Sequence, residues 1–121
     1  MYCVKILYPN RPGSSFNLQH YFDVHIPLGL RLMKEHCDLV PARLEVDTRP
    51  SGMTADSKVP YHAISSIYFE QRAEADACRA FFGREEIFRE LSRDFPNYTE
   101  SDPEIIFSEL VAIDPSSFKP L

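Results

Sequence analysis

The chain has 121 residues, with 44% hydrophobic and 26% charged residues and a formal net charge of −5 at pH 7. This length favours one domain, and the acidic balance offers no electrostatic attraction for a phosphate backbone, so we expect no nucleic-acid partner. Since no stretch approaches the roughly 18 consecutive apolar residues of a membrane span and the first residues lack the pattern of a secretory signal, we expect no membrane partner and a cytoplasmic location.

The first predicted elements are a strand, a loop and a long helix. Residues 2–8 carry apolar side chains at both alternating sets of positions, which predicts a strand. Residues 9–15 contain prolines, a glycine and serines, which are typical of a loop. From Asn17, a residue suited to capping, apolar residues recur at helical spacing. We therefore expect a helix that begins there and ends near Glu35 or His36.

The remaining chain continues with shorter elements. Residues 42–48 alternate strictly between apolar and polar side chains, which predicts a half-solvated strand at a sheet edge. The other predicted elements are, in order, a long connection at 49–60, a strand at 61–69, a helix at 70–82 interrupted by Gly83, a helix at 84–94, a turn-rich loop at 95–99, a strand at 104–113 and a tail at 114–121.

This order of elements, βαββαβ, is that of an α+β ferredoxin-like domain over residues 1–113, with a four-stranded antiparallel sheet. Right-handed crossovers place both helical layers on one face of the sheet. Residues 2–8, 61–69 and 104–113 are nevertheless apolar on both faces. One helix layer covers only one face, and an exposed apolar face marks an interface or a ligand site. We therefore predict a homodimer in which two sheets close on each other.

The sequence carries no strong catalytic or metal-binding motif, and we expect neither a metal nor a cofactor. Four glycines leave little material for a phosphate-binding loop. Cys3, Cys37 and Cys78 are odd in number and widely spaced, so we expect small buried hydrophobic residues in a reducing compartment. Function must therefore be argued from a few polar groups in apolar surroundings.

His25 is the main candidate for chemistry. It lies on the inward side of the predicted first helix, where an imidazole can serve as general acid or base or can be a core histidine bonded to a backbone carbonyl. Pro27 falls inside the same helix, where it would free the carbonyl of Asp23 and kink the helix unless the helix is interrupted. His20 is five residues from His25, roughly 140° around an α-helix, so the two cannot chelate one metal like an i,i+4 pair.

Two further residues have open interpretations. His62 faces the side of its strand opposite to Tyr61 and either packs there or contacts a ligand at the pocket or dimer seam. Tyr98 follows a Pro-Asn turn, from which its phenol either reaches a ligand or packs beneath the loop.

Residues 16–28, Phe-Asn-Leu-Gln-His-Tyr-Phe-Asp-Val-His-Ile-Pro-Leu, resemble the signature helix of EthD-like proteins, a family named for ethyl tert-butyl ether degradation. The family pattern reads Phe-Asp-x-x-Tyr-Tyr, three residues, then His-Met-Pro-Leu. Residues 4–9, 95–99 and 103–105 agree as well, and the resemblance covers about residues 2–113. It implies a dimeric α/β barrel built from ferredoxin-like protomers. The wider superfamily includes polyketide cyclases, cofactor-free monooxygenases, lactone isomerases and haem enzymes, and the EthD-like family has no single established reaction.

The resemblance also assigns residues. His25 matches the family histidine, Tyr21 the second tyrosine of the pair and Tyr98 the loop tyrosine. Two positions differ from the family pattern: His20 stands where the first tyrosine is usual, and Asn17 where an aspartate is usual. If the residue pair lines the pocket, the ligand preference of this chain differs from that of its relatives, and His20 becomes a second candidate site residue.

The first hypothesis is therefore a cofactor-independent enzyme that isomerises, dehydrates or decarboxylates a small hydrophobic or aromatic compound in catabolism. His25 would be the acid or base, and His20, Tyr21, His62 and Tyr98 would contact the substrate. The alternative is a non-catalytic ligand carrier or an accessory protein of a degradative oxygenase system. A third possibility is a haem protein with histidine ligation.

Overall fold

Four antiparallel strands and one layer of helices make up the computed structural model, which describes residues 1–119. The elements are, in order, β1 (Tyr2–Pro9), α1 (Leu18–His20), a π-helical turn (Tyr21–His25), α2 (Ile26–Cys37), β2 (Arg43–Thr48), β3 (Tyr61–Phe69), α3 (Arg72–Phe82), α4 (Glu85–Asp94), a 3₁₀ turn (Phe95–Asn97), β4 (Glu104–Glu109) and a second 3₁₀ turn (Pro115–Ser117).

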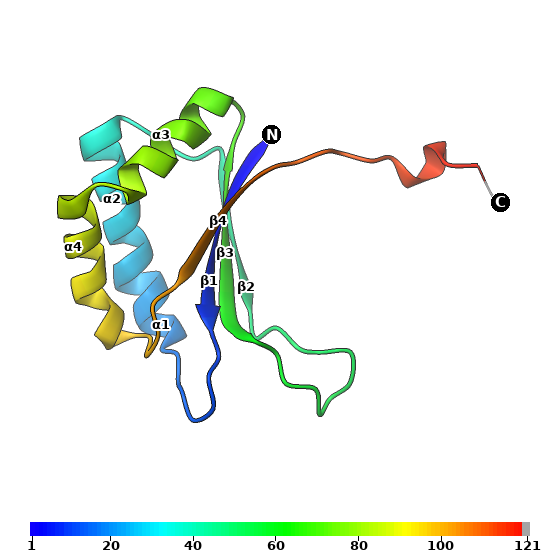
Figure 1. The fold of residues 1–121 in the computed structure, drawn as a ribbon, viewed down its shortest axis with the longest axis horizontal. Helices are drawn as coiled ribbons and strands as arrows, with labels where there is room; N and C mark the ends of the chain where they lie inside the picture. Colours follow the sequence, from blue (N-terminus) through cyan, green and yellow to red (C-terminus); the bar gives the residue numbers. More distant parts are fainter. Residues whose placement is uncertain (120–121) are drawn as a thin grey trace.

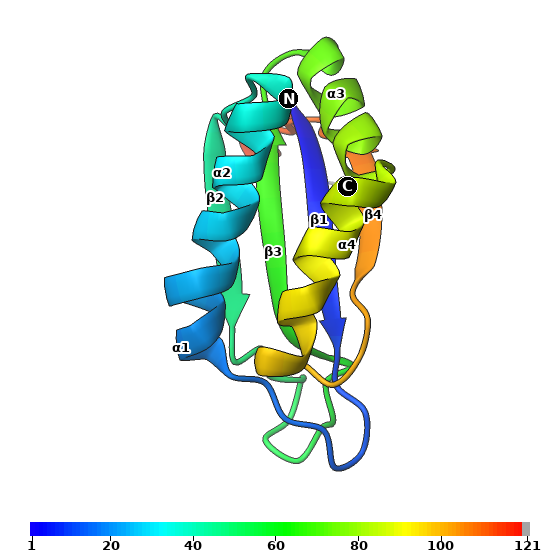
Figure 2. The ribbon, with the colours of Figure 1, turned by 90° about the vertical axis from the view of Figure 1, so that its left-hand side faces the viewer.

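The sheet has the strand order β2-β3-β1-β4, with every neighbouring pair antiparallel. All of the longer helices cover the same face of this sheet, and the opposite face is open (Figure 1). Seen from the helix side, α2 and α4 lie next to each other in front of the sheet, with their axes roughly along the strands (Figure 2). The predicted ferredoxin-like α+β fold is confirmed, and the strictly alternating strand β2 lies at a sheet edge as expected.

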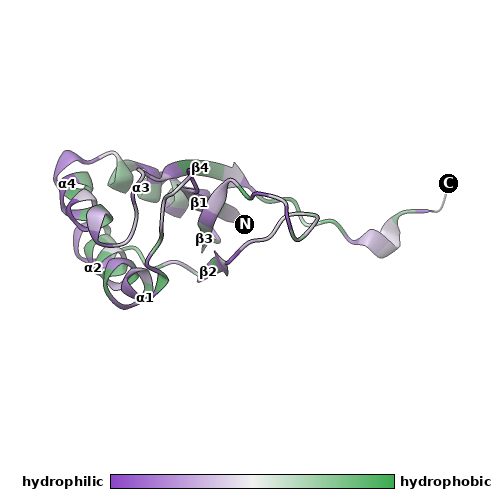
Figure 3. Cartoon of the chain, turned by 90° about the horizontal axis from the view of Figure 1, so that it is seen from below, coloured by the Kyte–Doolittle hydropathy of each residue, from purple (hydrophilic) through white to green (hydrophobic). Residues whose placement is uncertain are grey.

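The fourth strand is shorter than predicted. It pairs with β1 from Glu104, opposite Leu7, to Glu109, opposite Tyr2, and the expected continuation to residue 113 is wrong. The reason is that β1 begins at Tyr2, so residues after Glu109 have no strand to pair with beyond the bond from the Leu110 amide to the Met1 carbonyl. Residues 110–119 instead leave the sheet as an arm that extends away from the helix layer (Figures 1 and 3).

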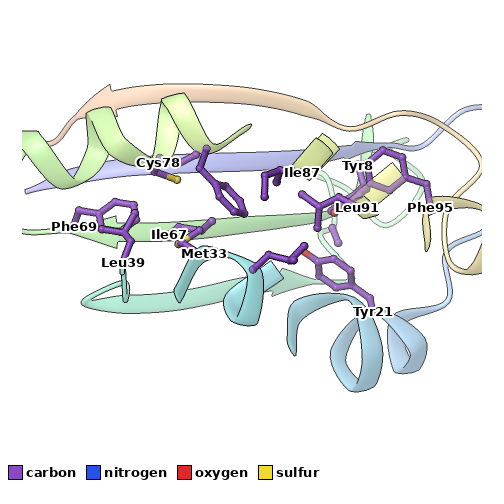
Figure 4. Close-up of a cluster of buried hydrophobic side chains, with 14 of the residues drawn as sticks. Tyr8, Tyr21, Met33, Leu39, Ile67, Phe69, Cys78, Ile87, Leu91 and Phe95 are labelled. Atoms are coloured by element: carbon purple, nitrogen blue, oxygen red, sulfur yellow. The ribbon is translucent and has the colours of Figure 1, made fainter. Parts of the chain in front are cut away.

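The hydrophobic core lies between the helices and the sheet. The register aligns Val4 with Ile67 and Phe107, and Ile6 with Ile105, on the face toward the helices. Tyr8 and Tyr21 lie at one end of the buried cluster, and Phe69 and Leu39 lie at the other (Figure 4). Of the three cysteines, Cys3 and Cys78 are buried as predicted and Cys37 is half-buried, and all three are free thiols.

The first helix changes its hydrogen-bond pattern before Pro27. Asn17 caps its start by accepting a hydrogen bond from the His20 amide at 3.1 Å, as its residue type predicted. The Ile26 amide then bonds to the Tyr21 carbonyl, an i→i+5 bond that defines a π-helical turn. Pro27 follows at the start of α2, where a missing amide proton costs little. The chain thus passes the proline by means of the π turn.

Candidate functional site

The side chain of His25 is hydrogen-bonded to a carboxylate on another helix. Its Nδ1 lies 3.0 Å from Oδ2 of Asp94, the last residue of α4, and both side chains are 10% exposed. No buried side-chain polar atom among residues 1–119 lacks a partner, and Nδ1 is the only His25 atom with a side-chain hydrogen bond there. The second ring nitrogen, Nε2, is therefore free of protein partners and open to a water-sized molecule.

His20 reaches the same carboxylate. Its Nε2 lies 2.8 Å from Oδ1 of Asp94, which also accepts a hydrogen bond from the Asn97 amide group at 3.0 Å. The expected separation of roughly 140° between His20 and His25 is wrong, because it assumed an uninterrupted α-helix. The i→i+5 bonding of the π turn places residues five apart over one another, and both imidazoles therefore face Asp94.

The electrostatics of this group favour a neutral His25 beside an ionised Asp94. Burial lowers the pKa of His25, and the hydrogen bond and charge of Asp94 offset only part of that effect. For Asp94, desolvation acts to raise the pKa, but hydrogen bonds from Asn97, His20 and His25 together outweigh it and hold the pKa below its usual value. With Asp94 accepting at Nδ1, the neutral ring carries its proton there and keeps a lone pair on Nε2.

Two neighbouring aromatic rings pack against His25. The Tyr98 ring centroid lies 4.6 Å from that of His25, and the Tyr21 ring stacks on His25 at 5.8 Å with 20° between the planes. Tyr98 is 3% exposed and its hydroxyl lies 2.9 Å from that of Tyr8. The Tyr21 hydroxyl bonds to Ser65 Oγ on β3. Burial raises the pKa of all three tyrosines, so their hydroxyls stay protonated at neutral pH.

A cavity lies between α2 and the sheet, with His25 in its wall. The centre of a water molecule can occupy about 60 Å³ of it. Its polar lining residues are Tyr8, Tyr21, His25 and Ser65; the others are apolar side chains and Gly29, and none carries a charge. Each water molecule needs about 10–15 Å³ of such space, so the cavity holds roughly five waters. Five waters in the liquid fill about the same volume as one six-membered ring.

The predicted site residues therefore separate into two groups. His20, His25, Tyr21 and Tyr98 converge on one cluster. His62 lies apart from it: its Nε2 bonds to Ser14 Oγ at 2.9 Å and its ring stacks on Phe16, outside the cavity lining.

Sequence reasoning missed Asp94 and Tyr8. Tyr8 has the pattern of an ordinary strand residue, and only the register brings it to the cavity beside Ser65. Asp94 gave a usable signal, since a carboxylate in the last turn of a helix opposes the helix dipole. Such a residue needs a donor from elsewhere, and here it has three.

Within residues 1–119, no group of three or more His, Cys, Asp or Glu side chains is arranged to hold a metal ion. No helix in that same range has both the length and the apolar character needed to cross a membrane.

Comparison with known proteins gives a family match and several structural matches. The model of the EthD domain family matches residues 16–102. An EthD-like protein from Ralstonia eutropha JMP134 superposes with a TM-score of 0.71 at 21% identity, over 95% of this chain and 96% of the other. An ethyl tert-butyl ether degradation family protein from Bacillus halodurans C-125 gives 0.59 at 13% identity, over 92% and 99%. HapK from Hahella chejuensis gives 0.52 at 17% identity, over 94% and 96%. No curated protein sequence matches the chain.

Proposed function

Because the chain belongs to the EthD domain family, whose matched region includes His20, His25 and Asp94, we propose that it is a cofactor-independent acid–base enzyme for a small, largely apolar molecule. His25 is the catalytic residue, and the reaction is a proton transfer of the isomerase, dehydratase or decarboxylase type. Both family and fold are compatible with other roles, so the proposal rests on the site itself.

The observation that carries the proposal is the pairing of His25 with Asp94 at the cavity wall. A general base needs a free lone pair, a fixed orientation and a pKa near the working pH. The neutral ring has its Nδ1 proton bound to Asp94, and its Nε2 lone pair is left without a protein partner. The carboxylate also stabilises the imidazolium formed when Nε2 takes a proton from the substrate. Asp94 is therefore a positioning residue and His25 the proton acceptor.

The other cluster residues support this arrangement. Tyr21 holds the ring of His25 in place by a stacked contact and Tyr98 by a tilted one. His20 and Asn97 occupy the remaining acceptor capacity of Asp94 and so keep its charge stable inside the fold. Of the five predicted site residues only Tyr21 and His25 line the cavity, and His20 and Tyr98 act through Asp94 and His25. His62 takes no part, because its contacts are with Ser14 and Phe16 and not with His25 or Asp94.

The experiment compares the wild-type chain with His25→Gln and with His36→Gln, an exposed histidine on α2 that does not line the cavity. Each is incubated with a small-molecule extract in D₂O, and products are followed by mass spectrometry. We expect mass changes with wild type and His36→Gln that are absent with His25→Gln. A change that persists in His25→Gln contradicts the assignment. A ligand that co-purifies and stays unchanged with every variant favours the alternative, a non-catalytic carrier.

We also propose that the protein is a homodimer closed through the open sheet face. That face presents apolar side chains, among them Leu7, Ile64 and Ile106, the last of which is 48% exposed. The arm that follows β4 extends from the same side of the sheet and exposes Val111 and Phe118 (Figure 3). A second copy presents the same apolar face and covers both features by two-fold symmetry.

A further inference from the structure

The cavity beside His25 has a chemical character that narrows the ligand. Its lining includes no Lys, Arg, Asp or Glu, so a carboxylate or phosphate placed there would be desolvated without a counter-charge. A hydrocarbon alone would leave the hydroxyl groups of the wall facing an apolar surface. The lining therefore suits an uncharged molecule that is mostly apolar and carries one hydrogen-bond acceptor.

The hydroxyl groups of the cavity wall indicate where the hydrogen-bond acceptor of the ligand would bind. Tyr21 bonds to Ser65 and to Tyr8, and Tyr8 bonds to Tyr98, so four hydroxyls in a row share three hydrogen bonds and one O–H proton is left over. When the row is directed from Tyr98 towards Ser65, the spare proton belongs to the Tyr21–Ser65 end, which lines the cavity, and an acceptor bound there favours that direction. Burial raises the pKa of Tyr21, which keeps its hydroxyl protonated at neutral pH.

The Tyr21–Ser65 pair and His25 line the same cavity. The Tyr21 ring is stacked with that of His25, with centroids 5.8 Å apart and 20° between the planes. A carbonyl oxygen bound by the Tyr21–Ser65 pair would thus have its α-carbon close to the imidazole. Removal of an α-proton by Nε2 breaks the C–H bond, moves its electron pair into a C=C bond and places the negative charge on the carbonyl oxygen. The same O–H donor stabilises that oxyanion.

Gly29 leaves room for a ligand to enter the cavity. It lies on α2 one turn after His25, on the helix face that lines the cavity, and a Cβ built on it would meet nothing within 4 Å. A glycine inside a helix costs stability relative to alanine, and packing does not require it here. Since helical side chains lean back over the preceding turn, a larger residue at position 29 would cover the turn that carries His25.

We propose that the cavity binds an uncharged carbonyl compound of about one ring, with its oxygen on the Tyr21–Ser65 pair and its body passing Gly29. This deepens the proposed function, on which the α-proton step rests, but binding itself does not depend on catalysis. The probe is acetophenone labelled with ¹³C at the carbonyl, and the control ligand is α-methylstyrene, which has nearly the same shape with a CH₂ group in place of the oxygen.

The binding experiment follows the carbonyl resonance by NMR and measures Kd for both ligands. We expect a downfield shift on binding to wild type. In the double variant Tyr21→Phe/Ser65→Ala the shift should disappear and the ketone should weaken about tenfold while α-methylstyrene does not. Removing both hydroxyls of a bonded pair leaves no orphaned group, so this variant should fold. Failure of the ketone to bind, an unshifted carbonyl, or equal weakening of both ligands overturns the proposal.

The entry route is tested at position 29. Gly29→Ala should raise the melting temperature by a few degrees, since alanine favours the helix, and Gly29→Leu should remain folded and lose ketone binding. Wild-type affinity in Gly29→Leu overturns the route. Exchange of the acetophenone methyl protons with D₂O is measured in parallel. Binding with a shifted carbonyl resonance but without exchange would reject the enzymatic function and keep the binding site. Exchange that depends on His25 but is unaffected by the double variant would keep the enzymatic function and reject the binding site.

Discussion

His20 and His25 contact the two oxygens of one carboxylate although five residues separate them in the chain. Their carboxylate partner, Asp94, lies 69 residues after His25. The arrangement depends on the ends of two helices meeting: the Asn17 amide bonds to the Tyr98 carbonyl at 2.8 Å, and Phe16 forms a β-bridge with Thr99. These two backbone contacts hold the start of α1 next to the loop after α4 and bring the two histidines within hydrogen-bonding distance of Asp94.

Asp94→Asn tests the electrostatic role of the carboxylate. Because the charge and hydrogen bond of Asp94 raise the pKa of His25 against desolvation, their loss should lower that pKa further. The free energy of unfolding should also fall by about 1–3 kcal/mol, since the donors of His20 and His25 lose a charged acceptor. The His25 titration is followed by NMR, with the exposed Asp23→Asn as control. An unchanged His25 pKa would contradict the assignment.

Stability should depend on pH through His25 and Asp94. The folded-state pKa of His25 lies below that of the unfolded chain, about 6.5. As the pH falls through this value the unfolded state binds more protons, so the free energy of unfolding should decrease by up to about 1.4 kcal/mol per pH unit. Asp94 has a lowered folded-state pKa, and its contribution is present above about pH 3.9 and is lost at lower pH.

Denaturant titrations from pH 8 to pH 4 check this profile. His25→Gln removes the titrating group and should flatten the curve near pH 6, while His36→Gln should keep the wild-type slope. A wild-type slope in His25→Gln would assign the effect to another group.

Tyr98→Phe tests the hydroxyl bridge under the site. The variant removes the hydrogen bond between the buried hydroxyls of Tyr8 and Tyr98, and the free energy of unfolding should fall by about 1–2 kcal/mol. Tyr61→Phe is the matched control, because its hydroxyl bonds to Glu104 on the exposed surface. It should cost less than about 0.5 kcal/mol. Equal losses for both variants would argue against a structural role for the buried bond.

Ile106→Glu tests the proposed dimer. A charge buried between two closed sheet faces is strongly disfavoured, so the variant should be monomeric. Val40→Glu, which changes an exposed residue in the connection after α2, should leave the mass unchanged. Light scattering after size exclusion gives the mass directly. A wild-type protein that is monomeric at high concentration, or an Ile106→Glu dimer, would refute the sheet-face interface.

The sequence was sufficient for the fold because its periodicities are local. Alternation over residues 61–69 and helical spacing over residues 84–94 each follow from one face meeting the core. The end of the fourth strand was mispredicted because it is set by a distant residue: apolar side chains continue past Glu109, but β1 has already ended at Tyr2.

The site was only half predictable for a similar reason. His25 stood out as a polar group on an apolar helix face. Its relation to His20 required the π turn, which no periodicity reveals because a single i→i+5 bond changes the angle of every residue before it. Asp94 required knowledge of which helix ends meet. Pro27 marked the location of the irregularity but not its kind.

The π turn makes the first helix sensitive to the number of its residues and not only to their identity. A substitution at an exposed position such as Phe22 or Val24 leaves the backbone path intact. Deleting one of them would make the two histidines an i,i+4 pair, and in ordinary α geometry such a pair lies only about 40° apart on one face of the helix. His20 and His25 would then still face Asp94. An inserted residue would instead place them six apart, about 120° around an α-helix, so that they could no longer share one carboxylate. An insertion in this short segment is therefore expected to be far more damaging than a deletion or a point change at the same positions.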